Sequence, residues 1–270
     1  MADISTTLDN IIAHYKCGEA SDTTRADSTV NALDLDVANT CAQVTGHIDT
    51  DAAEFVYASA EWLEIADADK GALDMQHASG DFSMSVWAYF TSLPSTHGGN
   101  DIGFMAVYKS TGGLTSYTFH HTAANKMQAT VIDSSGNRCQ FLADAATIST
   151  GELNTWIHYG MSFDLSAMTM VFYKNGSSVA STSNNSGTVS KAKDVALGFT
   201  LGHSNVAGSQ YFDGRLQAAT ITSDVISGAE FSTIYNSGSG IPYEEAGSLI
   251  KSVNGVLRAN IKSWNGVILE

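Results

Sequence analysis

The stretch Asp81–Phe90, DFSMSVWAYF, decides the fold, because residues that favour strands crowd or alternate over ten positions between turn residues. Successive side chains of a strand point to opposite faces, so this stretch predicts a core strand. A second stretch, Met168–Lys174 (MTMVFYK), has the same character and predicts another core strand. Similar runs predict strands near residues 11–15, 54–57, 62–65, 102–108, 117–121, 127–132, 140–142, 155–163, 196–201 and 211–221.

Composition and turns agree with an all-β chain. The 270 residues are 43% hydrophobic and 15% charged and include 24 glycines, which suits many short strands joined by tight turns. A chain of this length can bury its core in one all-β domain, so no second domain is required. The expected turns are Ser135-Gly136-Asn137, Asn175-Gly176, Asn185-Ser186-Gly187 and Asp213-Gly214.

The charge excludes some partners. The formal net charge is −15, whereas binding to nucleic acid needs clustered Lys and Arg that neutralise phosphates. Anionic membranes are disfavoured for the same reason. No stretch reaches membrane-spanning length, and Met1–Ser5 carries no basic segment followed by an apolar run, so neither a membrane span nor a secretory signal is predicted.

The three cysteines, Cys17, Cys41 and Cys139, are widely spaced and form no CxxC pair. We expect buried thiols, although Cys17 and Cys41 could pair in an oxidising compartment.

The chain divides near residue 240. Ser227, with Glu230 three residues later, predicts the capped start of a single short helix. The following Ser237-Gly-Ser-Gly-Ile-Pro has the composition of a flexible linker. The predicted organisation is therefore a sandwich over residues 1–238, a linker over 239–249 and a tail over 250–270.

The tail contains a tandem repeat. Ile250–Leu257 (IKSVNGVL) recurs eleven residues later as Ile261–Ile268 (IKSWNGVI), with six of eight positions identical. Asn-Gly between apolar residues favours a tight hairpin turn, so each unit predicts a small β-hairpin. Such a hairpin is marginal alone, so we expect it to dock on the sandwich, on itself or on another chain. The docking residues are Val253, Asn254, Gly255, Val256, Trp264, Asn265, Gly266 and Val267.

Four sequence stretches follow one another in a fixed order and cover most of residues 8–238: 11–16 with 26–31, 53–65, 80–88, and 154–160 followed by 171–176 and 211–216. Together they resemble the laminin-G-like (concanavalin A-like) jelly-roll family of bacteria and phages. The resemblance implies an all-β fold: a two-sheet antiparallel jelly-roll sandwich with one short helix and a small C-terminal hairpin extension. It also implies that Trp87 lies in the core and that His158 is structural.

Candidate chemistry in the sequence favours binding over catalysis. No paired-carboxylate strand, nucleophile elbow, zinc motif or phosphate loop is present, so we expect no enzyme. His120 and His121 are adjacent on a predicted strand, so they should face opposite sides and cannot easily share a metal. Sugar recognition would use exposed aromatics and polar loop residues. The candidate ligand residues are Tyr117, His120 and His121, with Tyr89, Tyr108 and Tyr211 as further platforms.

Calcium is the expected cofactor, if there is one. The resemblance implies an ion held by loop carboxylates and amide oxygens, for which Asp27, Asn31 and Asp34 are candidates. A second acidic set comprises Asp67, Asp69 and Asp101. One feature counts against a calcium site. Where the family has a late acidic pair, this chain has Leu216-Gln217-Ala218, so a usual ligand position is lost.

The favoured function is a non-enzymatic structural or adhesive protein of a phage virion, such as a head decoration, fibre or tail-associated protein. The tail repeat resembles the "KkiNGva" hairpins of phage virion proteins. The expected partners are other virion proteins, a second copy of the chain and a surface glycan. The alternative is a secreted or cell-surface carbohydrate-binding module, with calcium as an optional cofactor.

Overall fold

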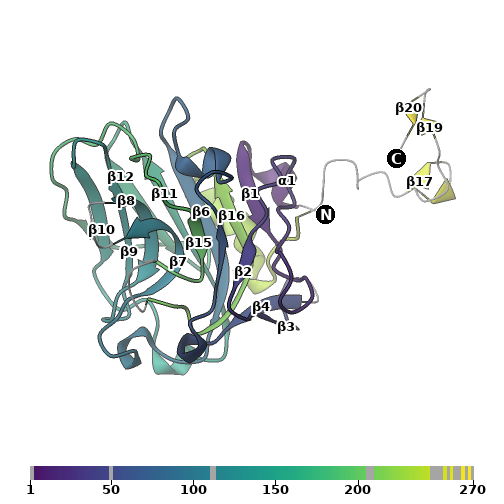
Figure 1. Ribbon diagram of the computed structural model, residues 1–270, viewed down its shortest axis with the longest axis horizontal. Helices are drawn as coiled ribbons and strands as arrows, with labels where there is room; N and C mark the ends of the chain where they lie inside the picture. Colours follow the sequence, from purple (N-terminus) through teal and green to yellow (C-terminus); the bar gives the residue numbers. More distant parts are fainter. Residues whose placement is uncertain are drawn as a thin grey trace.

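The computed structural model describes residues 3–48, 51–109, 114–204 and 210–243, together with four short strands between residues 252 and 268. Two eight-stranded sheets pack face to face as a sandwich (Figure 1). This confirms the predicted all-β fold class of two antiparallel sheets. Within the described ranges, no helix has the length and apolar character needed to cross a membrane.

The first sheet contains the core strand predicted from Asp81–Phe90. All of its strand pairs are antiparallel. Its order is β13 (Ser177–Val179), β12 (Thr169–Lys174), β11 (Trp156–Asp164), β6 (Phe82–Phe90), β16 (Gly214–Thr222), β4 (Asp51–Phe55) and β3 (Ala42–Thr45), with β1 (Ile11–Tyr15) also paired to β16.

The second sheet is likewise antiparallel. Its order is β14 (Ser181–Ser183), β10 (Arg138–Ala143), β9 (Met127–Ile132), β8 (Leu114–His121), β7 (Ile102–Lys109), β15 (Phe199–Leu201), β5 (Trp62–Ile65) and β2 (Asp36–Ala38).

The core lies between the sheets. On β6, Phe82, Met84, Val86, Ala88 and Phe90 all point inward. Their apolar surface is removed from water against the inward residues of the second sheet, which is the main term that stabilises a sandwich. The ring of Phe90 meets the rings of Phe104, Tyr159 and Phe212 edge-on, at centroid distances of 6.0, 6.0 and 4.9 Å.

Trp87 is buried, but it does not belong to this core. It points to the outer face of the first sheet, where it packs against His47 and His158 at centroid distances of 4.4 and 5.3 Å. Tyr235 stacks on it from the helix above. The prediction that Trp87 is a buried core residue is confirmed, since it is 1% exposed. Val86 and Ala88 take the positions between the sheets, so Trp87 is buried under the cover of the first sheet instead.

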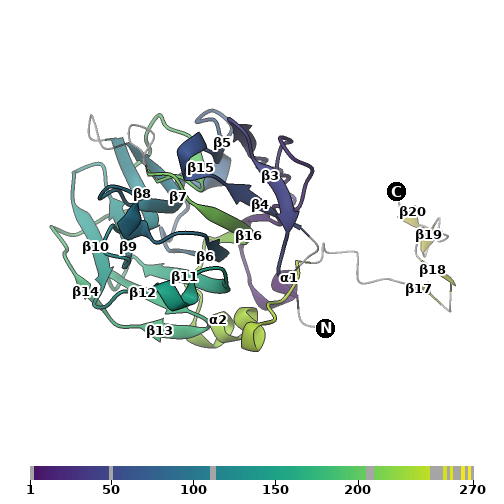
Figure 2. The same ribbon diagram turned by 90° about the horizontal axis from the view of Figure 1, so that it is seen from below.

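The outer face of the first sheet is covered by α2 (Gly228–Tyr235). Figure 2 shows α2 on the side of β12 and β13, with β7, β8 and β5 on the opposite side of the molecule. The predicted capping box is present: Glu230 N donates to Ser227 Oγ, and Ser227 N donates to the Glu230 carboxylate at 2.7 Å. Gly160 on β11 admits the helix, since a Cβ there would overlap the Phe231 ring.

This cover continues past the predicted boundary at residue 238. Ile241 and Tyr243 are buried with Ile4 and Leu8, and Ile4 N donates to Pro242 O at 2.9 Å. Ile4 lies in α1 (Ile4–Thr7), a short helix that the sequence analysis did not predict. The 3₁₀ turns are η1 (Tyr57–Ser59), η2 (Gly71–Asp74), η3 (Pro94–Thr96), η4 (Thr150–Glu152) and η5 (Asn236–Gly238).

In the tail, β17 (Ser252–Val253) pairs with β18 (Val256–Leu257), and β19 (Ser263–Trp264) pairs with β20 (Val267–Ile268). Val253 is paired with Val256, and Trp264 with Val267, so the two predicted strand pairs are present. Of the predicted docking residues, Asn254, Gly255, Asn265 and Gly266 lie outside the described residues, and docking itself stays a prediction.

The cysteines Cys17, Cys41 and Cys139 are all buried and free, so the alternative pairing of Cys17 with Cys41 is not formed. Burial raises the pKa of the Cys41 and Cys139 thiols to about 11, with Arg25 partly offsetting the effect at Cys41. These thiols are protonated at neutral pH and poorly reactive.

Candidate functional site

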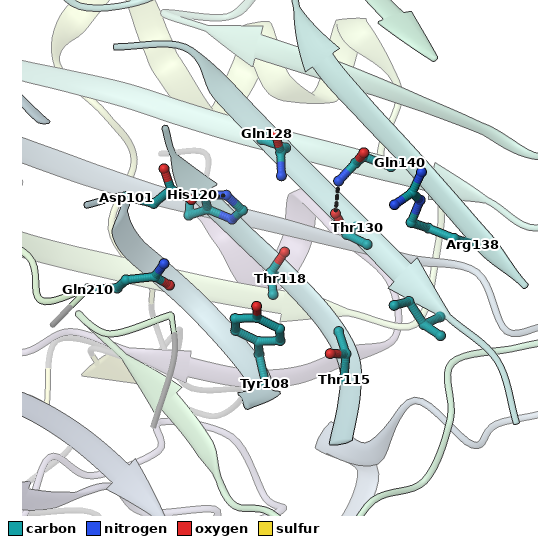
Figure 3. Close-up of a pocket in the computed structure, with 11 residues that line it drawn as sticks. Asp101, Tyr108, Thr115, Thr118, His120, Gln128, Thr130, Arg138, Gln140 and Gln210 are labelled. Atoms are coloured by element: carbon teal, nitrogen blue, oxygen red, sulfur yellow. Dashed lines mark hydrogen bonds and ion pairs between the residues drawn. The ribbon is translucent and has the colours of Figure 1, made fainter. Parts of the chain in front are cut away.

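A polar groove lies on the outer face of the second sheet. Its cavity measures about 210 Å³, and Figure 3 shows polar side chains from neighbouring strands converging on it. We use "polar groove" for the set Asp101, Tyr108, Thr115, Thr118, His120, Gln128, Thr130, Ile132, Arg138, Gln140 and Gln210.

The alternation of the strands places these side chains outward. On β8, Tyr117, Phe119 and His121 are fully buried toward the core, whereas Thr118 and His120 line the groove. On β9, Met127, Ala129 and Val131 point inward, and Gln128, Thr130 and Ile132 point outward. The groove is therefore the polar half of strands whose apolar half builds the core.

Strand register then sets these residues side by side. His120 is opposite Gln128, and Thr118 is opposite Thr130. Thr130 is in turn opposite Gln140 on β10, whose Nε2 donates to Thr130 Oγ1 at 3.0 Å (Figure 3). Because Thr130 Oγ1 accepts this bond, its own O–H remains available to donate toward the groove.

Asp101 and His120 form one end of the polar groove. Asp101 Oδ2 lies 3.5 Å from His120 Nε2, and Asp101 Oδ1 accepts the Ala123 N–H at 3.0 Å. Burial alone would raise the pKa of Asp101, but the hydrogen bond and charge of His120 and the Ala123 N–H outweigh it and lower the pKa. Asp101 is thus a carboxylate at neutral pH and can accept hydrogen bonds from a ligand.

Tyr108 contributes an aromatic ring and a hydroxyl. Burial and the charge of Asp101 raise the pKa of Tyr108, so its phenol stays protonated and can donate. A ring beside hydrogen-bonding groups is suited to a ligand that has both an apolar face and hydroxyls.

Several buried polar atoms of the groove have no hydrogen-bond partner among the described residues. They are Thr118 Oγ1, His120 Nδ1 and Arg138 Nε. Thr118 and His120 are only 4% and 5% exposed. Leaving a buried polar atom unsatisfied costs about 1–3 kcal/mol, which a ligand's hydroxyls can recover.

A family model for the concanavalin A-like lectin/glucanases superfamily matches residues 63–232, more than half of the chain and most of the sandwich. The chain belongs to this superfamily. A comparison with curated protein sequences gave no match.

Solved structures of the same fold are distant in sequence. The binding domain of Paraclostridial Mosquitocidal Protein 1 superposes with a TM-score of 0.60 at 15% identity, over 85% of this chain and 52% of that one. The receptor-binding domain of botulinum neurotoxin mosaic serotype C/D superposes with a TM-score of 0.59 at 12% sequence identity. The match covers 84% of this chain and 51% of that one. This chain thus spans about half the length of those two domains. Domain 4 of AbnA, an extracellular arabinanase from Geobacillus stearothermophilus, superposes with a TM-score of 0.53 at 18% sequence identity. The match covers 83% of this chain and 97% of that domain.

Of the predicted ligand residues, only His120 lines the groove of this superfamily member. Tyr117 points into the core and donates its hydroxyl to Leu73 O at 2.5 Å. His121 is also in the core, where its Nε2 lies 2.8 Å from Thr147 Oγ1. The assignment of Tyr117 and His121 to a ligand site is therefore wrong, because the pleat turns both inward. The prediction that His120 and His121 face opposite sides is correct.

The further tyrosine platforms are separated. Tyr108 lines the groove, and Tyr89 lies under the Arg215 guanidinium on the other sheet, 4.7 Å from it. Tyr211 stacks on His203 at 4.5 Å and on Trp62 at 5.6 Å between ring centroids. The sequence analysis did not name Trp62 for this role.

The predicted calcium residues do share one loop. Asp27 accepts the N–H groups of His14, Thr29 and Leu33, and Asp34 accepts the Asp27 N–H at 2.8 Å. Asn31 donates to Ile12 O at 2.8 Å. In the part of the chain that is described, no three His, Cys, Asp or Glu side chains are grouped to hold a metal ion. The loop's polar groups thus already stabilise its backbone.

The second acidic set is divided. Asp101 lies in the groove, whereas Asp67 binds the Lys70 ammonium. That ammonium is almost fully buried and also contacts Asp194 Oδ1, Val195 O and Leu197 O at 3.3, 2.6 and 3.1 Å. A lysine therefore takes the position that a cation would need between these oxygens.

Five further groove residues were not predicted: Thr118, Gln128, Thr130, Arg138 and Gln140. All but Arg138 occupy an outward position of a predicted strand, which was a usable signal, whereas Arg138 precedes the strand predicted at residues 140–142. Their sequence context does not distinguish them from ordinary solvent-facing residues.

Proposed function

We propose that the chain is a non-enzymatic carbohydrate-binding module whose sugar ligand lies in the polar groove. The observation that carries the proposal is the row of hydrogen-bonding side chains on β8, β9 and β10. Buried atoms of Thr118 and His120 in this row have no partner in the described part of the chain. A sugar presents many hydroxyls at close spacing, so it can satisfy such a row, while Tyr108 offers a ring for an apolar sugar face.

The AbnA domain supports this proposal by analogy, because its structure is described as a complex with arabinotriose and it matches this chain along almost its whole length. The analogy concerns the fold, since the identity is 18%.

The proposed role is non-catalytic. Hydrolysis of a glycosidic bond usually requires two carboxyl groups on either side of the bond. Asp101 is the one carboxylate among the described residues that line the groove. A lone carboxylate held by His120 and a backbone N–H is suited to accepting hydroxyl hydrogen bonds.

Isothermal titration of the purified chain with a panel of oligosaccharides tests the proposal. We expect Gln128→Ala to weaken binding about 5–10-fold and Asp101→Asn about 10–100-fold, the ranges for neutral and charged hydrogen bonds. Gln43→Ala, on the edge strand of the other sheet, is the matched control and should bind normally. No binding to any sugar, or release of shorter products during incubation, would overturn the proposal.

We further propose that the superfamily domain is displayed on a phage particle, to which the C-terminal hairpins attach it. The tandem hairpins with identical register support this, because short two-stranded units need a partner surface. The truncation that tests it should start at residue 250, since Ile241 and Tyr243 belong to the cover of the first sheet. The truncated chain should fold and bind sugar but no longer assemble with particles, and unchanged incorporation would contradict attachment by the tail.

Calcium at the loop of Asp27, Asn31 and Asp34 is proposed as an accessory ion only. Such an ion would stabilise the loop and not the groove. We expect chelator to leave sugar affinity unchanged, with any effect limited to the melting temperature.

A further inference from the structure

Arg138 lies at the end of the polar groove away from Asp101. It begins β10 and faces Ile132, whereas Gln128, the partner of His120, faces Leu142. Four residues along a strand span about 13 Å, and the two strand steps from β8 to β10 add about 10 Å across the sheet. Figure 3 shows Arg138 and the Asp101–His120 pair on opposite sides of the cavity.

Arg138 has no ion-pair partner among the described residues. Its Nε is buried without a hydrogen bond to any of them. The other arginines of the described residues are both paired: Arg25 Nε lies 3.9 Å from Glu19 and Arg215 Nε 3.3 Å from Glu54. In a chain with 28 acidic and 13 basic residues, an unpaired guanidinium is the exception.

The backbone fixes this guanidinium at the groove. Arg138 N donates to Ser186 O at 2.7 Å, and Ser186 N donates to Arg138 O at 2.8 Å. The strand therefore cannot slide to bring Arg138 to an acidic side chain elsewhere. A partly desolvated guanidinium without a partner is unfavourable, and its planar fork matches the two oxygens of a carboxylate.

The surroundings determine which anion fits. Next to Arg138 are the neutral groups of Thr130, Gln140 and Ile132, while Asp101 would repel an anion at the far end. The net charge of −15 disfavours a polyanion, so a ligand with one acidic group, placed at Arg138, is preferred.

We propose that the groove binds an oligosaccharide that contains an acidic sugar, with the sugar's carboxylate against Arg138 and neutral hydroxyls against Asp101 and His120. This inference rests on the proposed function, since it names the class of sugar that the same groove takes. The distance between the two ends exceeds one sugar ring, so at least two units take part.

The test compares each acidic oligosaccharide with its methyl ester by isothermal titration. The probes are an oligogalacturonate, a glucuronate-substituted xylo-oligosaccharide and a sialylated trisaccharide, each as free acid and as ester. We expect at least one free acid to bind about 10–100-fold more tightly than its ester, the range for a charge-assisted hydrogen bond. Arg138→Gln should remove that preference while keeping the affinity for the ester, and Arg138→Lys should restore part of it.

Arg215→Gln on the other sheet is the matched control and should keep the preference, and circular dichroism checks that each variant is folded. Equal binding of acid and ester in all three pairs would overturn this inference and leave the proposed function intact. An acid preference that survives in a folded Arg138→Gln would also overturn it. Failure of every probe, together with neutral oligosaccharides, would overturn the proposed function itself.

Discussion

The two sheets of this sandwich differ in what lies on their outer faces. On the first sheet, α2 and residues 241–243 cover the strands, and the Tyr173 and Phe231 rings stack at a centroid distance of 4.1 Å. Some outward polar groups there bond to the covering segments. Ser83 Oγ donates to Asp224 O and accepts the Ile226 N–H, at 2.7 and 2.8 Å.

The outer face of the second sheet carries the polar groove instead. Thr118 and His120 occupy the same kind of outward strand position as Ser83, yet no described residue bonds to Thr118 Oγ1 or His120 Nδ1. Trp87 and His158 on the covered face also carry buried polar atoms without a partner among the described residues, but α2 closes them off from solvent. The faces therefore differ in access, because the unpartnered atoms of Thr118 and His120 line a cavity that a ligand can enter. The first face should thus control stability and the second should control binding.

The largest expected effect concerns Phe231, which is fully buried between α2 and β11. Phe231→Ala should lower the free energy of unfolding by about 3–5 kcal/mol, because it leaves a cavity under the helix. Urea denaturation measures the change. Sugar affinity of the folded fraction should not change, because the groove lies on the other sheet.

Gln128→Ala is the control for Phe231→Ala, because it should have the opposite pattern of effects. It should weaken sugar binding while changing the free energy of unfolding by less than about 0.5 kcal/mol, as is usual for a surface substitution. If both variants lost stability and affinity together, the division between the two faces would be wrong.

An intermediate effect is expected at His158, which lies under the same cover. Burial lowers its pKa from 6.5 to about 3, so the folded chain keeps it neutral while the unfolded chain protonates it below pH 6.5. The stability due to this group is therefore complete above pH 6.5 and is lost as the pH falls toward 3. At pH 5 the loss is about 2 kcal/mol.

His158→Leu should reduce the difference in unfolding free energy between pH 7 and pH 5 by that amount. Urea denaturation at the two pH values measures it, with Lys70→Ala as a control that removes a buried charge contact elsewhere but keeps His158. An undiminished pH dependence in His158→Leu would show that burial under α2 does not hold this histidine neutral.

The smallest effect tests how much the cap of α2 adds to the cover. Ser227→Ala removes the side-chain acceptor for Glu230 N and should cost about 1 kcal/mol. Ser232→Ala, at an exposed position of the same helix, should change stability much less. Thermal melts compare the two, and equal effects would mean that packing alone fixes the helix.

Features of the fold were predictable where they depend only on residues a few positions apart in the sequence. Three strands, β1, β5 and β9, have the predicted bounds, and the capping box of Ser227 and Glu230 has the predicted contacts. The tail contains the two predicted strand pairs. The short strands β2, β3, β13 and β14 were missed, because three or four residues carry too little periodic signal.

The site was less predictable, and the reason is visible on β8. The sequence established that His120 and His121 face opposite sides, but not which side is the core. Tyr117 and His121 were therefore proposed for a ligand that only His120 can reach. The groove also depends on β7 to β10 lying side by side, which brings Asp101 and Arg138 to one cavity from positions 37 residues apart.

The sequence by itself determined that the chain is an all-β sandwich, since alternation and turn residues act over a few positions. It also determined the capped helix and the tail hairpins for the same reason. Only the tertiary structure decided which sheet face is covered by α2 and residues 241–243 and which remains a polar groove. That choice depends on contacts between segments far apart in the chain, such as Ile4 with Pro242 and Gly160 with Phe231, which no local pattern records.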